Sequence, residues 1–113
     1  MAKKILWHYH RKGWTSCIRA EQFVAANNIE VQEVVSANQK LQAADIKKIL
    51  NGTNKLWVAK GKKVSEFEPH KEITSDMIAA MLGPTGNLRA PTLITGKNVV
   101  VGFNAELYEE IFS

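Results

Sequence analysis

Two short apolar runs flank an amphipathic stretch at the start of the chain, and this order limits the possible folds more than any other feature. Residues 5–9 (ILWHY) have the length and composition of a buried strand, and residues 29–35 alternate well enough for a second strand. Between them a helix is predicted to about residue 28, with the hydroxyl of Thr15 or Ser16 capping its start. A strand, a helix and a strand in succession need a crossover connection, so we expect the two strands to be parallel.

The rest of the chain is predicted to add helices and then a hairpin. The expected elements are a helix within residues 36–51 (clearest over 41–50), a helix from Thr74 or Ser75 to Leu82, strands over 92–95 and 99–103 joined by a turn, and a last helix from Asn104 through Phe112. Residues 56–67 fit either a hairpin around Gly61 or an extended excursion, which leaves the conformation of residues 54–74 open. The order indicates a single α/β domain over residues 1–113.

Size and charge limit the partners that such a chain can have. Its 113 residues, 45% of them hydrophobic, suffice for one domain with its own core. The 15 basic and 11 acidic residues leave a net charge of +4, and the basic residues are scattered, so no specific nucleic-acid partner is expected. No apolar run approaches the roughly 20 residues needed to span a bilayer, and the N-terminus turns polar too soon for a signal peptide. We therefore expect a cytoplasmic protein without a membrane partner.

Cys17 is the only cysteine, which excludes an intramolecular disulfide. It falls in the first turn of the predicted helix, where backbone amides and the helix dipole stabilise a thiolate and lower its pKa. A buried and inert thiol is the alternative, because free cysteines are often fully buried. His8 and His10 share a face of the first strand, but with Cys17 they lack a fourth ligand, so no metal site is expected.

Two motifs stand far apart in the chain. One is the helix start Thr15-Ser16-Cys17-Ile18-Arg19-Ala20. The other is Leu88-Arg89-Ala90-Pro91-Thr92-Leu93-Ile94 followed by Val99-Val100-Val101-Gly102-Phe103-Asn104. Together they resemble the thioredoxin superfamily and, within it, the arsenate-reductase-like family that includes the Spx-type regulators. The resemblance implies a thioredoxin-like fold, with a central mixed sheet of four strands and helices on both faces. It also implies a cis peptide bond before Pro91, which would present the backbone of Ala90 to a substrate strand.

The chain departs from the family at the positions that carry arsenate chemistry. Trp14 stands where the family's reductases have their reactive cysteine, and Cys17 matches the second cysteine of the Spx-type pair. The arginine that precedes the proline in those reductases is Ala90 here, with Arg89 shifted by one position. A further family arginine is matched to Lys60. These departures argue against arsenate reduction.

Two functions from different classes fit these residues. The first is a thiol-redox protein in which Cys17 forms mixed disulfides, with an external thiol such as glutathione or a thiol-containing protein as co-reactant, because no second cysteine can resolve them. The second is a non-catalytic module, such as an Spx-like adaptor or regulator, that binds a protein in the same cleft. Whether the chain is an enzyme stays open. The residues expected to contact the substrate or partner are Trp14, Thr15, Ser16, Arg19, Lys60, Arg89, Ala90 and Pro91.

Trp14 itself has two interpretations. Its indole could cover Cys17 or stack on a ligand, or it could be an exposed loop side chain that fills the space of the missing cysteine.

Overall fold

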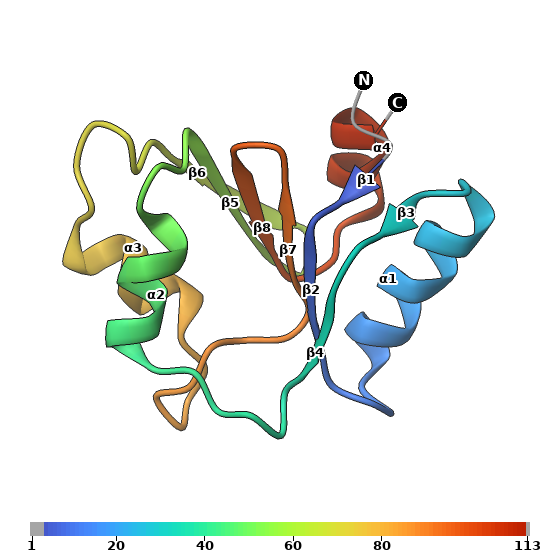
Figure 1. Cartoon of the computed structure of the whole chain (residues 1–113), viewed down its shortest axis with the longest axis horizontal. Coiled ribbons are helices and arrows are strands. Elements are labelled where there is room, and N and C mark those ends of the chain that lie inside the picture. Colours follow the sequence, from blue (N-terminus) through green and yellow to red (C-terminus); the bar gives the residue numbers. More distant parts are fainter. Residues whose placement is uncertain (1–3, 113) are drawn as a thin grey trace.

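A six-stranded mixed sheet forms the middle layer of the molecule (Figure 1). The computed structural model describes residues 4–112, so residues 1–3 and 113 of the predicted domain, with the polar start of the N-terminus, lie outside the described part. The sheet has the strand order β4-β2-β7-β8-β5-β6, and β1 and β3 form a separate parallel pair. The strands are β1 (Lys4–Ile5), β2 (Trp7–His10), β3 (Glu30–Val31), β4 (Val34–Ser36), β5 (Lys55–Lys60), β6 (Lys63–Phe67), β7 (Thr92–Thr95) and β8 (Asn98–Val101).

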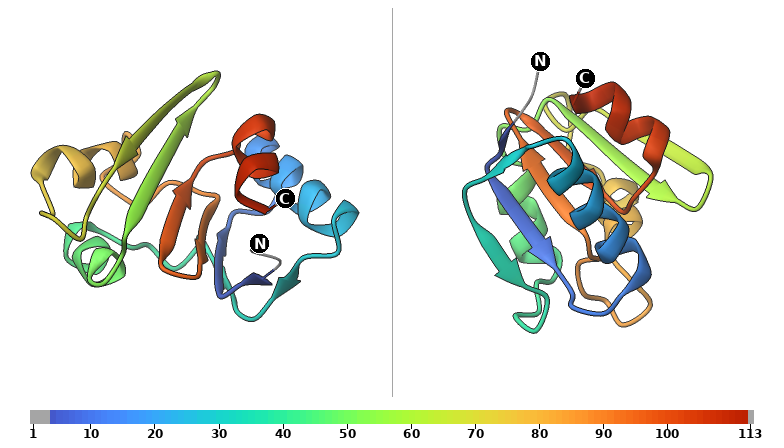
Figure 2. Two further views of the ribbon diagram at one scale, coloured as in Figure 1. Left: turned by 90° about the horizontal axis from the view of Figure 1, so that it is seen from above. Right: turned by 90° about the vertical axis from the view of Figure 1, so that its right-hand side faces the viewer.

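Helices cover both faces of this sheet, as expected (Figure 2). The helices of the described chain are α1 (Thr15–Ala26), α2 (Ala43–Leu50), α3 (Ser75–Met81) and α4 (Ala105–Phe112). One core cluster joins α2 and α3 to one face through Ile46, Leu50 and Met81. The other joins α1 and α4 to the opposite face around Ala20 and the fully buried Tyr108.

The prediction of a four-stranded sheet is wrong. The segment around Gly61, whose conformation the sequence did not decide, contributes two more strands. It forms an antiparallel hairpin of β5 and β6, one of the two conformations expected there. β5 then pairs in parallel with β8, placing Trp57 beside Val100. The alternating buried positions of β5, such as Leu56 and Val58, let this strand lie inside the sheet, and β6 becomes its edge.

The N-terminal strands pair in parallel as predicted, but each of the two predicted strands is interrupted and forms two short strands. β2 runs parallel to β4, with His8 beside Val34, while the chain bends at Leu6 and again between β3 and β4. The predicted cap of α1 is wrong: Trp14 is the N-cap residue and makes no side-chain capping bond, so neither Thr15 nor Ser16 has that role.

The later caps agree with the sequence analysis. The Thr74 hydroxyl accepts a hydrogen bond from the amide of Met77 (3.2 Å) at the start of α3. The Asn104 side chain accepts one from the amide of Leu107 (3.0 Å) in the first turn of α4. Within residues 4–112, no helix is long and apolar enough to cross a membrane.

Candidate functional site

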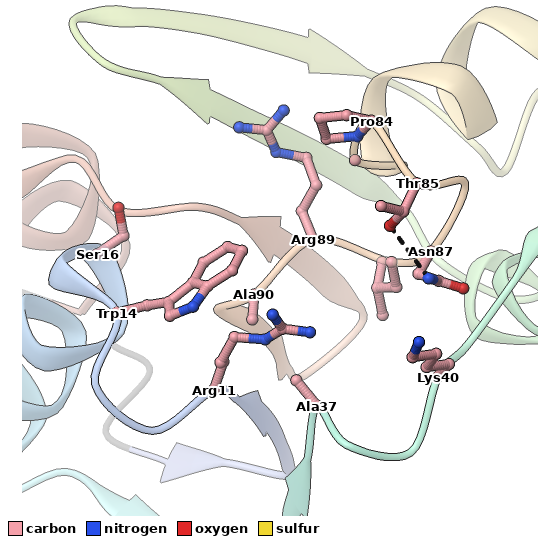
Figure 3. A pocket seen from close by; sticks show the side chains of 12 residues that line it. Arg11, Trp14, Ser16, Ala37, Lys40, Pro84, Thr85, Asn87, Arg89 and Ala90 are labelled. Carbon is pink, nitrogen blue, oxygen red and sulfur yellow. Dashed lines mark hydrogen bonds between the residues drawn. The ribbon is translucent and has the colours of Figure 1, made fainter.

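A groove of about 420 Å³ opens at the end of the sheet where the β2–α1, β4–α2 and α3–β7 loops meet (Figure 3). Twelve residues line it, and none of them is acidic. The first loop contributes Arg11 and Trp14, the second contributes Lys40, and the third contributes Arg89 and Ala90. The groove is therefore a cationic surface assembled from three separate parts of the chain.

The β2–α1 loop holds Arg11 and Trp14 against each other. The guanidinium carbon of Arg11 lies 4.3 Å from the centre of the indole ring, in the geometry of a cation–π contact. Gly13, with φ of 86°, supplies the left-handed conformation that the turn between them needs. Trp14 is 51% exposed and lines the groove, so the part of its ring that Arg11 does not cover is open to a ligand.

Cys17 lies beneath this loop and is fully buried. Its Sγ accepts a hydrogen bond from the backbone amide of Arg11 (3.4 Å). Burial raises the pKa of the Cys17 thiol, and the hydrogen bond from Arg11 opposes that effect without reversing it. Desolvation of the thiolate thus outweighs the stabilisation available at the helix start. Of the two interpretations given above, the structure agrees with the buried thiol.

The β4–α2 loop carries Lys40 to the groove and is fastened at three points. The hydroxyl of Tyr9 donates a hydrogen bond to the carbonyl of Gln39 (2.8 Å). The amide of Leu88 donates to the carbonyl of Leu41 (2.7 Å), and the side chain of Gln42 lies 3.4 Å from that of Asn87. These contacts tie the second loop to the third and fix one wall of the groove.

The α3–β7 loop presents the backbone around Pro91. The amide of Arg89 donates to the carbonyl of Met81 (3.0 Å), and the Thr92 hydroxyl donates to the carbonyl of Arg89 (2.6 Å). The Ala90–Pro91 bond is cis, the isomer that the resemblance implies. Among residues 4–112, neither the N–H nor the C=O of Ala90 has a hydrogen-bond partner, and this residue lines the groove. Its donor and acceptor are thus available to a ligand.

The three basic side chains of the groove lack a counter-ion among residues 4–112. Arg11, Lys40 and Arg89 form no ion pair within the described part of the chain. Figure 3 shows the guanidinium of Arg11 and the amine of Lys40 on one side of Ala90, and the guanidinium of Arg89 directed toward the other rim. Because like charges gathered without a partner repel one another, an anionic ligand would relieve a cost that the free protein carries.

The structure brings together only part of the site predicted from the sequence. Trp14, Ser16, Arg89 and Ala90 line the groove. Five expected residues do not: Cys17, Thr15, Arg19, Lys60 and Pro91. Cys17 and Pro91 are buried below it, and Lys60 lies at the far end of β5 next to the hairpin turn. Lys60, which was expected to contact the substrate or partner, therefore does not line this groove.

Sequence reasoning missed Arg11 and Lys40. Arg11 stands three positions before Trp14, and this spacing within one short loop was the available signal. No local sequence pattern predicts Lys40 as a groove residue. Its position depends on hydrogen bonds that its neighbours Gln39 and Leu41 accept from Tyr9 and Leu88, which are far away in the sequence.

The two histidines of β2 lie next to each other and close to an acidic side chain of α1. His8 and His10 lie edge to face with ring centres 5.5 Å apart, and His10 approaches Glu21 at 3.4 Å. Over residues 4–112, no group of three or more His, Cys, Asp or Glu side chains is arranged to hold a metal ion.

Comparison with known proteins gives no assignment: neither a protein-family model nor a curated protein matches this sequence.

Proposed function

We propose that this chain is a thioredoxin-like domain that acts as a non-catalytic binding module and takes an extended polypeptide segment in its groove. The strands β4-β2-β7-β8 support the proposed fold, because β2 runs parallel to β4 and antiparallel to β7, and β7 and β8 form a hairpin followed by α4. This is the βαβ and ββα arrangement expected of such a domain. The β5–β6 hairpin is then an extension at one edge.

Relationship to the arsenate-reductase-like family is part of the same proposal, and the residues of the Gly-Phe-Asn motif support it. Gly102 has φ of 86°, and a Cβ there would collide with the carbonyl oxygen of Ala59. The Phe103 ring packs edge to face on Tyr108 (4.7 Å), and Asn104 caps α4. Each motif residue thus has a structural task that its own side chain, or the lack of one, fulfils.

The unpaired backbone of Ala90 is the observation that carries the binding proposal. An extended peptide recognises a free main-chain donor and acceptor by adding a strand-like pair of hydrogen bonds, and side-chain pockets beside it supply specificity. The groove offers both, with Trp14 as an aromatic surface next to the backbone.

Selection of binding peptides tests this function directly. The immobilised chain is panned with a phage-displayed library of random heptapeptides, and the enriched peptides are measured against an Ala90→Phe variant, whose larger side chain would fill the groove. Ala105→Phe is the matched control, since Ala105 is exposed on α4 and does not line the groove. We expect binding to be lost in Ala90→Phe and kept in Ala105→Phe, with both variants folded by thermal unfolding. Equal binding to all three proteins would contradict the proposal.

The thiol-redox function stays as a second hypothesis. Cys17 keeps its place in the first turn of α1, and the amide of Arg11 donates to its sulfur. In that function the Cys17 thiolate would attack oxidised glutathione, forming a protein–glutathione disulfide and releasing one glutathione thiolate. The full burial of Cys17 and its raised pKa disfavour this step.

Alkylation with iodoacetamide separates the two functions. A thiol that reacts in the native protein as fast as in the denatured protein at pH 7.5 would support redox chemistry. We expect modification only after unfolding, because the native thiol is both inaccessible and protonated.

A further inference from the structure

We infer that the groove is selective for acidic extended segments, an inference that rests on the proposed binding function and defines the chemistry of its partner. The observation behind it is the charge of the lining. Arg11, Lys40 and Arg89 line the groove from three different loops, and no acidic residue is among the lining residues.

The surrounding structure leaves these charges available to a ligand. The ion pairs found in the described chain join other residues, such as Lys55 with Glu66. The carboxylate of Asp45, near the β4–α2 loop, accepts a hydrogen bond from the backbone amide of Gln42 (3.0 Å) at the start of α2. A carboxylate from a partner would therefore meet cations that form no ion pair with any residue of the described chain.

The two sides of Ala90 are both positive, which points to more than one acidic position in the segment. Arg11 and Lys40 lie on one side of Ala90 and the guanidinium of Arg89 lies toward the other rim (Figure 3). A segment paired with the free N–H and C=O of Ala90 would thus carry carboxylates on both sides of the paired residue. Because neighbouring residues of an extended segment are about 3.3 Å apart along the chain, a few residues suffice to reach both sides.

A polypeptide fits the groove better than a small inorganic anion does. The cavity, at about 420 Å³, falls in the range of sites for ligands much larger than a phosphate ion. Trp14 is half exposed, and Ile18, one helical turn further along α1, is 42% exposed, so an apolar surface continues from the groove onto the helix. A phosphate ion could accept a hydrogen bond from the free N–H of Ala90, but it would not cover this apolar surface.

The composition and salt dependence of the selected peptides test this inference. Heptapeptides selected on the full chain are expected to be enriched in Asp and Glu over Lys and Arg. Their dissociation constants, measured by fluorescence anisotropy, should rise several-fold between 50 and 500 mM NaCl, because salt screens exposed charges.

Three variants test the groove cations one at a time: Arg11→Gln, Lys40→Gln and Arg89→Gln should each weaken binding roughly three- to tenfold. Lys12→Gln is the matched control, since Lys12 is an exposed cation of the same loop that does not line the groove, and it should change binding less than about twofold.

The other outcomes distinguish failure of the acidic selectivity from failure of the proposed peptide-binding function. Selected peptides without acidic enrichment, bound at Ala90 with no salt dependence, would overturn the acidic selectivity and leave the binding module standing. Failure to select any peptide, together with saturable phosphate binding that shifts the amide resonance of Arg11, would overturn both and identify a small-anion site. Equal weakening by Lys12→Gln and the three groove variants would also overturn the inference, because the effect would then follow net charge alone.

Discussion

The backbone amide of Arg11 points at the Sγ of Cys17, 3.4 Å away, and this contact links the buried thiol to the groove above it. Cys17 does not itself line the groove, yet its sulfur accepts a hydrogen bond from the amide of Arg11, which lines the groove together with Trp14 of the same loop. The thiol is placed to hold the binding surface in shape, whatever its chemistry.

Removal of this anchor should destabilise the fold measurably. Cys17→Ala leaves a small void and an amide with no acceptor, so we expect the free energy of unfolding to fall by about 1–2 kcal/mol. Urea denaturation followed by circular dichroism measures it. Ser16→Ala is the neighbouring control, because Ser16 is exposed, and it should change stability by less than about 0.5 kcal/mol. If both variants are equally stable, the sulfur does not anchor the loop.

Local patterns in the sequence were enough to predict the parts of the fold that depend on neighbouring residues. The parallel pairing of β2 with β4, the β7–β8 hairpin and the Asn104 cap follow from periodicity, turn residues and capping chemistry within short windows. The parallel pairing of β5 with β8 was not predictable in the same way. It joins segments more than 40 residues apart, and the alternation in β5 fits any sheet position with one strand on each side.

The candidate site likewise contains residues that local sequence predicts and residues whose position depends on distant contacts. Trp14 and Arg89 could be found because they stand next to motif residues. Lys40 could not, because the β4–α2 loop is held by the hydroxyl of Tyr9 and the amide of Leu88. The burial of Cys17 is likewise a property of the assembled loop: a helix start alone favours a thiolate, and the covering chain reverses that preference.

Tyr9 should affect both stability and the groove. Its hydroxyl donates to Gln39 next to Lys40, so Tyr9→Phe should lower the free energy of unfolding by about 1 kcal/mol and weaken peptide binding as the loop loosens. Tyr108→Phe is a matched control, because that hydroxyl also donates a 2.8 Å bond to a carbonyl, at Gly102, outside the groove lining. We expect a similar loss of stability there with unchanged peptide affinity. Equal loss of affinity in both variants would show that binding follows global stability.

His8 should make the protein sensitive to mild acid. Burial, with a smaller contribution from His10, lowers the pKa of His8 from 6.5 to about 4. The unfolded chain therefore takes up a proton below pH 6.5 that the folded chain refuses until about pH 4, and stability falls as the pH falls through this window. The loss amounts to on the order of 2–3 kcal/mol. Denaturant midpoints measured from pH 7 to pH 4 should show it.

Two variants assign that acid sensitivity to a residue. His8→Leu removes the titrating group and should flatten the pH dependence between 6.5 and 4, even if the variant is less stable at pH 7. His70→Gln should retain the slope, since His70 is exposed. A slope that survives in His8→Leu would assign the effect to another group.

Gly102 and Gly96 both have a left-handed backbone, but only Gly102 is closely packed. A Cβ at Gly102 would meet the carbonyl oxygen of Ala59 in addition to adopting φ of 86°, whereas Gly96, with φ of 58°, has open space around it. Gly96→Ala should cost about 1 kcal/mol from backbone conformation alone. Gly102→Ala should cost several times more, or prevent folding, because β8 must separate from β5 to admit the methyl group. Thermal unfolding of the two purified variants measures this difference, and soluble yield decides the matter if Gly102→Ala does not fold. Equal melting temperatures would mean that the β5–β8 contact yields without cost and that the close approach at Gly102 does not constrain the sheet.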